Sequence, residues 1–269
     1  TPVLYEISEA RAFESVAEGR PIDVHLKVDT GMGRLGVPLA ELDPFLRELR
    51  SFPSIRVAGL MTHFSTADAD PDYVAEQLRG FKQAEGLVRR FGHVPAVLHA
   101  ANSAALFRHP ETHFDWVRPG ISLYGYPGSD SVDVPLRPAM RWRTEVLRVR
   151  MLQQGESAGY GRTFRATRPT RLATIPLGYG DGLLRSASNR GHVLIRGVRC
   201  PIVGNVAMDL TTVDVSQVPD ASIGDEVLLL GVQDGVSLDA RDLAEAAGTI
   251  PYEVLTNVSR RVPRVYVND

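Results

Sequence analysis

Residues 25–36 bring together side chains that could form a binding site. Apolar and polar residues alternate over residues 22–28, which is the period of a β-strand. Lys27 and Asp29 lie on its polar side, and glycines then surround Arg34 in a segment that must turn sharply. A (β/α)₈ barrel presents its site in this way, with charged side chains entering a loop at the carboxyl end of a strand. A surface hairpin with solvated charges is the alternative for this segment alone.

Further blocks of glycine, aromatic and polar residues follow along the chain. With the first, they make seven blocks in a fixed order: KVDTGMGRLG, MTHFST, HAANSAA, VRPGISLYG, SAGYG, IPLGYGDG and GNVAMD. Together they resemble the alanine racemases, isomerases that use pyridoxal 5'-phosphate (PLP) as cofactor. The resemblance runs from about residue 21 to the C-terminus. It implies fold-type III architecture and the interconversion of L-alanine and D-alanine, which supplies D-alanine for the peptidoglycan of the cell wall.

One block of the family is missing from this sequence. The barrel strand that carries the PLP lysine would lie upstream of Thr1, and the two lysines present, Lys27 and Lys82, stand in no such motif. Half a barrel would leave unpaired strand edges and an uncovered interior. We therefore expect the native protein to have upstream residues, and this chain alone to be inactive; an inactive PLP-barrel fragment is the alternative.

The elements that must position these blocks fall into two kinds. Strands and helices alternate in the first part, with strands predicted at 22–28, 57–63, 97–101 and 114–117 and helices at 43–50, 72–91 and 104–107. Short strands follow at 141–151, 170–176, 192–195, 198–203, 210–215 and 226–230, then a helix at 239–247.

This order predicts an α/β plus β fold, a partial (β/α)₈ TIM-type barrel followed by a mainly β domain. The segment 127–138, rich in Gly, Ser, Asp and Pro, separates them, so we place the domains at 1–128 and 129–269. Ser237 or Asp239 should cap the late helix, and Pro251 should end any helix.

PLP needs an anchor for its phosphate, and two predicted strand ends could provide one. Asn102 and Ser103 open a predicted helix, where a simple N-cap role is the alternative. Gly120 and Ile121 follow the next strand. The resemblance implies that Ser103, Gly120, Ile121 and Tyr252 hold the phosphate and that Asn102 also belongs to the cofactor site.

Arg118 ends a predicted strand, and a buried arginine must be paired or must serve a ligand. An ion pair with Asp115 is the alternative. The resemblance implies that Arg118 faces the pyridine nitrogen of PLP, and that His63 lies near the ring and links Arg118 to a catalytic tyrosine. Arginine stays protonated, so it cannot give that nitrogen a proton.

Racemisation needs a base on each face of the substrate, and the resemblance implies that Tyr160 is one and the family's lysine the other. It further implies that Arg34 and the Met208 backbone N–H meet the substrate carboxylate. Lys27 would be carbamylated to pair with Arg34; an unmodified Lys27 neutralised by Asp29 is the alternative.

Other residues match positions along the family's substrate corridor: Tyr179, Asp181, Arg185 and Asp209. Asn205 stands where the family often has arginine, and Ala207 replaces a usual cysteine. These departures leave strict alanine selectivity open. The resemblance also implies a homodimer whose β-rich domain contributes Tyr160 and Met208 to the partner's active site.

The composition argues against several classes of partner. The chain has 269 residues, and its 30 basic and 32 acidic side chains give a net charge of −2, which indicates neither nucleic acid nor an anionic membrane. No apolar run approaches the ~18 residues of a membrane span. No spacing matches a metal site, so we expect an enzyme without a metal. The single cysteine, Cys200, fits a reducing compartment, so we expect the enzyme to be cytoplasmic.

Related functions remain as alternatives: a broad-specificity amino-acid racemase, an amino-acid decarboxylase, and a non-enzymatic PLP carrier of the same barrel type. The carriers lack a second domain, which the residues after 129 would form. The decarboxylases use a cysteine from the partner subunit, and Cys200 lies outside any such motif.

Overall fold

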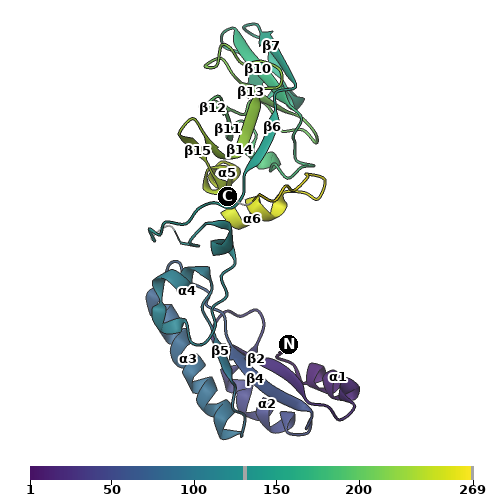
Figure 1. Cartoon of the computed structure of the whole chain (residues 1–269), viewed down its shortest axis with the longest axis vertical. Coiled ribbons are helices and arrows are strands. Elements are labelled where there is room, and N and C mark those ends of the chain that lie inside the picture. The colour runs from purple at the N-terminus through teal and green to yellow at the C-terminus, as the bar shows by residue number, and fades with distance from the viewer. Residues whose placement is uncertain (130–131, 268–269) are drawn as a thin grey trace. The chain divides into compact units, whose positions relative to one another are not determined.

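The computed structural model describes residues 1–129 and 132–267, which form two compact units, Thr1–Arg137 and Pro138–Asp269 (Figure 1). Residues 130 and 131, inside the predicted linker, lie outside the described residues. No helix in the described ranges combines the length and hydrophobicity needed to cross a membrane.

The first unit is built on a parallel sheet in the order β1-β2-β4-β5, with the short β3 paired to β2. The strands are β1 (Val3–Leu4), β2 (Ile22–Asp29), β3 (Val37–Pro38), β4 (Ile55–Met61) and β5 (Val97–His99). The helices are α1 (Ile7–Ala17), α2 (Leu42–Leu49), α3 (Pro71–Arg90) and α4 (Ser103–Arg108). Four strand–helix pairs therefore follow one another, in agreement with the predicted partial barrel.

The alternation of β2 divides its two faces between the core and the site. Val24, Leu26 and Val28 are fully buried in one apolar cluster with side chains of α2 and α3. The opposite face carries His25 and Lys27, which are only half-buried. The helices thus cover one face of the sheet and leave the polar face of β2 available for chemistry.

The second unit is antiparallel throughout its three sheets: β13-β10-β7, then β12-β11-β14-β15 with β6 beside β14, and the β8-β9 pair. The strands are β6 (Trp142–Glu145), β7 (Arg148–Leu152), β8 (Ser157–Ala158), β9 (Phe164–Arg165), β10 (Thr170–Ile175), β11 (His192–Ile195), β12 (Val198–Pro201), β13 (Thr211–Asp214), β14 (Glu226–Gln233) and β15 (Val236–Leu238). The helices α5 (Ala240–Ala247) and α6 (Pro251–Asn257) follow. This is the predicted mainly β domain.

Short 3₁₀ helices connect these elements and carry several of the predicted site residues. They are η1 (Leu39–Glu41), η2 (Pro110–Thr112), η3 (Ile121–Tyr124), η4 (Tyr160–Arg162) and η5 (Arg185–Ala187).

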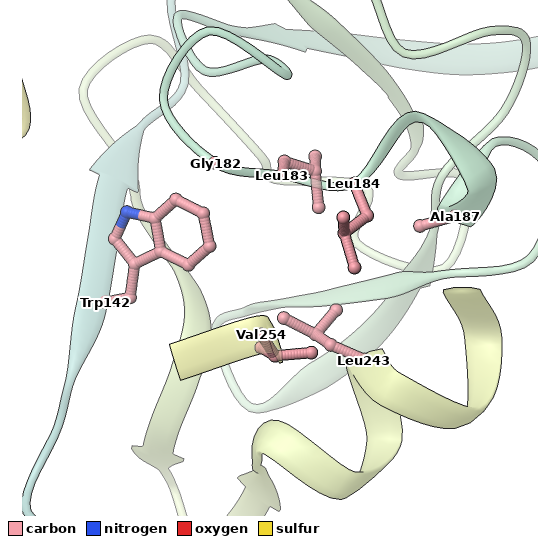
Figure 2. Close-up of a pocket in the computed structure, with 7 residues that line it drawn as sticks. All are labelled: Trp142, Gly182, Leu183, Leu184, Ala187, Leu243 and Val254. Atoms are coloured by element: carbon pink, nitrogen blue, oxygen red, sulfur yellow. The ribbon is translucent and has the colours of Figure 1, made fainter. Parts of the chain in front are cut away.

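Apolar packing fixes α5 and α6 on the second unit. Figure 2 shows Trp142 of β6, Leu243 of α5 and Val254 of α6 converging on the loop that contains Leu183 and Leu184. Because this contact buries Val254 two residues after Tyr252, it sets where the predicted phosphate-binding tyrosine is presented.

The structure corrects several predicted elements. The single strand predicted at 141–151 is two strands, because the chain crosses between sheets: Val146 N donates to Asp225 O, and Leu147 N to Thr174 O. The predicted strand at 114–117 is reduced to one bridge at Trp116, since Phe114 has a φ of 48°.

The two ends of the chain also differ from expectation. Pro251 begins α6 instead of ending a helix, because the first helical position needs no N–H donor. The strand β1 and the helix α1 were not predicted at all. Asp239, one of the two predicted caps, does cap α5.

Candidate active site

The carboxyl ends of the parallel strands of the first unit deliver the predicted cofactor residues to one edge of the sheet. Lys27 lies at the end of β2, His63 follows β4, and Ser103 follows β5. Arg118 follows the bridge between His99 and Trp116. Because parallel strands all point the same way, these side chains gather at the edge where barrel enzymes hold their sites.

Arg118 is held by neutral acceptors within the described part of the chain. Its guanidinium donates to Thr62 O at 2.7 Å, Ala100 O at 3.0 Å and His99 Nδ1 at 3.0 Å. The alternative ion pair with Asp115 is not formed, and that carboxylate accepts from Leu98 N at 2.8 Å. Burial lowers the pKa of Arg118 to about 10, so it remains a cation at neutral pH. A partly buried cation that no described carboxylate pairs with is suited to a ligand.

Two histidines to which the sequence analysis gave no role, His99 and His25, extend this network. Arginine can only donate, so His99 Nδ1 accepts from Arg118 and the neutral ring carries its proton on Nε2. His99 Nε2 then donates to His25 Nδ1 at 2.8 Å. Burial, followed by the charges of Arg118 and His25, lowers the pKa of His99 to about 4. The signal was present in the alternation of β2, which puts His25 on the same face as Lys27.

His63 lies beside Arg118 in the same neutral state. Its Nδ1 is 3.4 Å from the Arg118 guanidinium, which leaves the proton of the neutral ring on Nε2. Burial first, and then the charges of Arg118, Arg34 and Lys27, lowers the pKa of His63 to about 4.

Gln77, a buried side chain of α3, fixes the loop that carries His63. It donates to His63 O at 3.1 Å and accepts from Ser65 N at 3.0 Å. This long-range contact was not predicted, because nothing in the local pattern distinguishes Gln77 from other polar helix residues.

Lys27 is affected by the charges of two other cations, Arg34 and Arg118. Burial, then the charges of Arg34 and Arg118, lowers its pKa. The charge of Asp29 acts in the opposite direction and raises this pKa, but it is the weakest influence and no ion pair between Lys27 and Asp29 forms within the described residues. The Asp29 carboxylate instead accepts from three backbone N–H groups of the glycine-rich turn: Gly31 at 2.9 Å, Met32 at 2.8 Å and Gly33 at 2.9 Å. Asp29 therefore builds the loop that presents the exposed Arg34.

Three of the residues predicted to hold the phosphate lie together in the first unit. Ser103 Oγ accepts from Gly120 N at 2.9 Å, which joins the two strand ends and brings Ile121 with it. Gly120 is exposed, and a Cβ there would meet no atom within 4 Å. Asn102 Oδ1 accepts from Ala105 N at 3.0 Å and so acts as an N-cap. An open glycine backbone beside a serine hydroxyl fits a phosphate group.

Tyr160 is presented to solvent by a glycine turn of the second unit. Its side chain is 75% exposed, between Gly159 and Gly161, which both have a positive φ. Asn205 Nδ2 donates to Tyr160 O at 2.8 Å. The residue noted as a departure from the family pattern thus holds the backbone of the predicted base.

The corridor residues of the second unit lie on two neighbouring loops. Tyr179 and Asp181 are on one, and Met208 and Asp209 are on the other. Both aspartates pair with Arg261, which sequence reasoning missed. Arg185, in η5, is exposed, and Tyr252 is partly exposed at the start of α6. The described residues contain no cluster of His, Cys, Asp and Glu arranged to hold a metal ion.

Two family models match the chain: "Alanine racemase, N-terminal domain" over residues 1–127, and "Alanine racemase, C-terminal domain" over residues 139–266. The alanine racemase of Sorangium cellulosum is 46% identical over 274 residues, which cover 98% of this chain and 72% of that relative. The chain belongs to the alanine racemase family. The resemblance carried by the seven motifs is therefore confirmed, as is the predicted fold class.

Solved alanine racemases share this fold. The enzyme of the D-cycloserine producer Streptomyces lavendulae superposes with a TM-score of 0.92 at 34% identity, covering 99% of this chain and 72% of that one. The alanine racemase of Bacillus anthracis, solved with bound L-Ala-P, superposes with a TM-score of 0.91 at 32% identity, covering 99% and 70%.

Proposed function

We propose that this member of the alanine racemase family interconverts L-alanine and D-alanine with PLP as its cofactor. The observation that carries the proposal is Arg118, a partly buried cation whose partners in the described residues are carbonyls and neutral imidazoles instead of a carboxylate. PLP, when bound, withdraws electrons from the substrate and makes its Cα proton removable.

Arg118 donates a hydrogen bond to the pyridine nitrogen in this proposal. Because a guanidinium is always protonated, it supplies charge and direction but does not transfer its proton. The Arg118–His99–His25 network keeps the guanidinium in place, and each of its members is neutral apart from Arg118 itself. Because Arg118 does not protonate the pyridine nitrogen, PLP withdraws electrons less strongly from the substrate. This suits a racemase, which must return a proton to Cα and avoid side reactions.

The phosphate is held where the Ser103 hydroxyl meets the Gly120–Ile121 backbone, with Tyr252 adding a hydroxyl. Asn102 acts indirectly, by capping α4 and so fixing Ser103. The open space at Gly120 supports the assignment, because a Cβ there would meet no atom within 4 Å and a phosphate could approach the backbone closely.

Tyr160 moves the proton at Cα on the face used by the L substrate, and the family's lysine serves the other face. His63 supports the phenolate, since its Nε2–H is free to donate after Nδ1 has accepted from Arg118. Arg34 and the Met208 N–H bind the substrate carboxylate, and the corridor consists of Tyr179, Asp181, Arg185 and Asp209.

Lys27 is carbamylated in this proposal. Its lowered pKa favours the neutral amine, which is the form that reacts with CO₂. Nζ forms a bond to the carbon of CO₂ and loses a proton to solvent, and the charge becomes −1 on the new oxygens. The resulting anion pairs with Arg34 and replaces a repulsion by an attraction.

The active enzyme is a homodimer in this proposal, and the β-rich unit of one subunit supplies Tyr160 and Met208 to the partner's site. We place it in the cytoplasm, where it would supply D-alanine for peptidoglycan. The division into domains at 1–128 and 129–269 stays a prediction; the two compact units divide nearby, after Arg137.

Substitution of Tyr160 tests the function. In the native PLP-loaded protein, Tyr160→Phe should lower L-to-D conversion by about 100-fold or more, because one of the two bases is lost. Exchange of the Cα proton of D-alanine with D₂O should survive through the other base. Normal rates in both directions would remove Tyr160 from the mechanism.

Mixing two inactive variants tests the shared site. A Tyr160→Phe subunit and an Arg118→Glu subunit should regain activity in the mixed dimer, because one of its two sites would combine an intact Arg118 with an intact Tyr160. Mixed dimers confirmed by mass but without activity would show that each site is built from one chain.

A further inference from the structure

Arg261, in the segment after α6, joins the two loops that carry the corridor residues. Its Nε donates to Asp181 Oδ1 at 2.9 Å, and its Nη2 donates to Asp209 Oδ1 at 2.6 Å. The same Nη2 lies 3.4 Å from Met208 O. One planar guanidinium therefore contacts both loops at once, which a single-point cation such as lysine could not reproduce.

The two loops are also joined through their backbones. Tyr179 N donates to Ala207 O at 2.9 Å, and Gly180 N donates to Met208 O at 2.9 Å. A Cβ at Gly178 would overlap the Ala207 carbonyl, and one at Gly180 would lie 2.5 Å from the Arg261 guanidinium. The glycines of the GYGDG motif thus admit this close approach and leave Tyr179 pointing away from it, partly exposed.

This arrangement fixes the direction of the Met208 N–H. In a trans peptide the C=O and N–H groups point in opposite directions, and Ala207 O points at Tyr179 N. The Met208 N–H therefore points away from the Tyr179 loop, and it has no acceptor among the described residues. Its own carbonyl has two donors, Gly180 N and Arg261.

The position of Arg261 is itself fixed. Arg261 N donates to Ser259 Oγ at 3.3 Å, and Ser259 N donates to Asp181 O at 2.9 Å. The segment after α6 is thus attached to the same loop that its arginine contacts, so the guanidinium approaches from a defined direction.

We infer that Arg261 is a positioning residue, which aligns the Met208 N–H and Tyr179 for an α-amino acid carboxylate. The inference rests on the proposed function, in which Met208 meets that carboxylate. A purely stabilising role is the weaker explanation, because the Arg261 side chain is 47% exposed and the Asp209 side chain 61% exposed, and exposed ion pairs add little to folding stability. The Asp181 side chain is 17% exposed, but it also accepts from Gly178 N, so it stays paired when Arg261 is removed. Loss of Arg261 should disturb loop geometry more than folding.

The native PLP-loaded protein allows a test with matched variants. Arg261→Ala and Arg261→Gln remove the contact, Arg261→Lys keeps only the charge, and Arg260→Gln is the control, since Arg260 is exposed and makes no side-chain hydrogen bond or ion pair within the described ranges. Three quantities are measured: kcat and KM for alanine, the Kd of propionate as a carboxylate probe, and hydrogen–deuterium exchange of residues 178–182 and 207–209.

We expect Arg261→Ala and Arg261→Gln to raise KM and the propionate Kd on the order of tenfold with little change in kcat, because ground-state and transition-state binding are lost together. Amide exchange in both loops should rise, Arg261→Lys should lie between, and Arg260→Gln should match the wild type. The Tm should be unchanged, which separates positioning from stability.

An Arg261→Ala protein with unchanged loop exchange and unchanged propionate affinity would overturn the inference. Failure of the wild type to racemise alanine would overturn the proposed function instead. In that case the exchange measurement still decides whether Arg261 holds the two loops together.

Discussion

Two arginines, one in each unit, show how differently a guanidinium can be used. Arg118 is partly buried and bound by the carbonyls of Thr62 and Ala100 and by the His99 ring. Arg261 is half exposed and bound by two carboxylates, those of Asp181 and Asp209. Burial lowers the pKa of Arg118 to about 10, whereas the hydrogen bonds of Asp209 and Asp181 raise that of Arg261.

The difference lies in what each arrangement leaves unsatisfied. Around Arg261 two carboxylates more than compensate the single positive charge, so its contribution is the shape of two loops. Around Arg118 no carboxylate of the described residues compensates the charge, and withdrawing a cation from water without one is unfavourable unless a ligand benefits. An uncompensated, partly buried cation therefore indicates chemistry, whereas a compensated, exposed one indicates geometry.

The largest effect should come from removing the unbalanced charge. Arg118→Glu places a carboxylate among acceptors that need a donor, and it could also give a proton to the pyridine nitrogen, so kcat/KM for alanine should fall by about 100-fold or more. Arg79→Gln is the matched control in the same unit, because Arg79 is exposed and has no side-chain partner among the described residues.

Arg118→Lys tests whether the positive charge alone is sufficient. Lysine keeps the charge but cannot donate to Thr62 O, Ala100 O and His99 together, so its activity should lie between wild type and Arg118→Glu. If Arg118→Glu retained wild-type kcat/KM, the contrast between the two arginines would have no functional meaning.

A smaller effect on activity should come from Lys27, the lysine whose pKa is lowered by the charges of Arg34 and Arg118. Lys27→Ala should lower kcat/KM about tenfold, since Arg34 would lose the anion that orients it. The native protein equilibrated with ¹³C-bicarbonate should show a carbamate signal by NMR that disappears in Lys27→Ala. Lys82, the other lysine of this sequence, is exposed, and Lys82→Ala should keep both the signal and the activity. A spectrum without a carbamate in the wild type would leave Lys27 as an unmodified amine.

The comparison also shows which parts of the site the sequence could predict. The alternation of β2 predicted the polar face that carries Lys27, whereas Arg118 and Tyr160 were singled out by the resemblance of their motifs to the family. Arg261 could not be found in this way, because its partner Asp181 is 80 residues away and nothing near it is periodic. Contacts made only by tertiary folding have no local signal.

The same limit applies to the fold. Period-two strands and the long α3 were predicted within a few residues, since each repeats its pattern several times. The two-residue β1 and the strand that crosses between sheets at Val146 were not, because their partners come from distant segments. For His25 and His99 the sequence predicted the strands that carry them, but only the structure showed that their rings form a network with Arg118.

The last effect concerns the neutral histidines around Arg118, and it should appear as a pH dependence of stability instead of a change in activity. An unperturbed histidine has a pKa of 6.5 and burial lowers the pKa of His99 to about 4, so between these values the unfolded chain binds a proton that the native protein does not. Stability must therefore fall as the pH drops from about 6.5 to about 4, and for one such group we expect a loss of about 3 kcal/mol. Urea unfolding of the native protein at pH 7 and pH 4.5 measures it. His99→Asn should flatten this dependence, whereas the exposed His192 of the second unit should leave it unchanged in His192→Asn. Equal slopes in wild type and His99→Asn would mean that His99 is already charged beside Arg118, and the neutral surroundings that distinguish Arg118 from Arg261 would not exist.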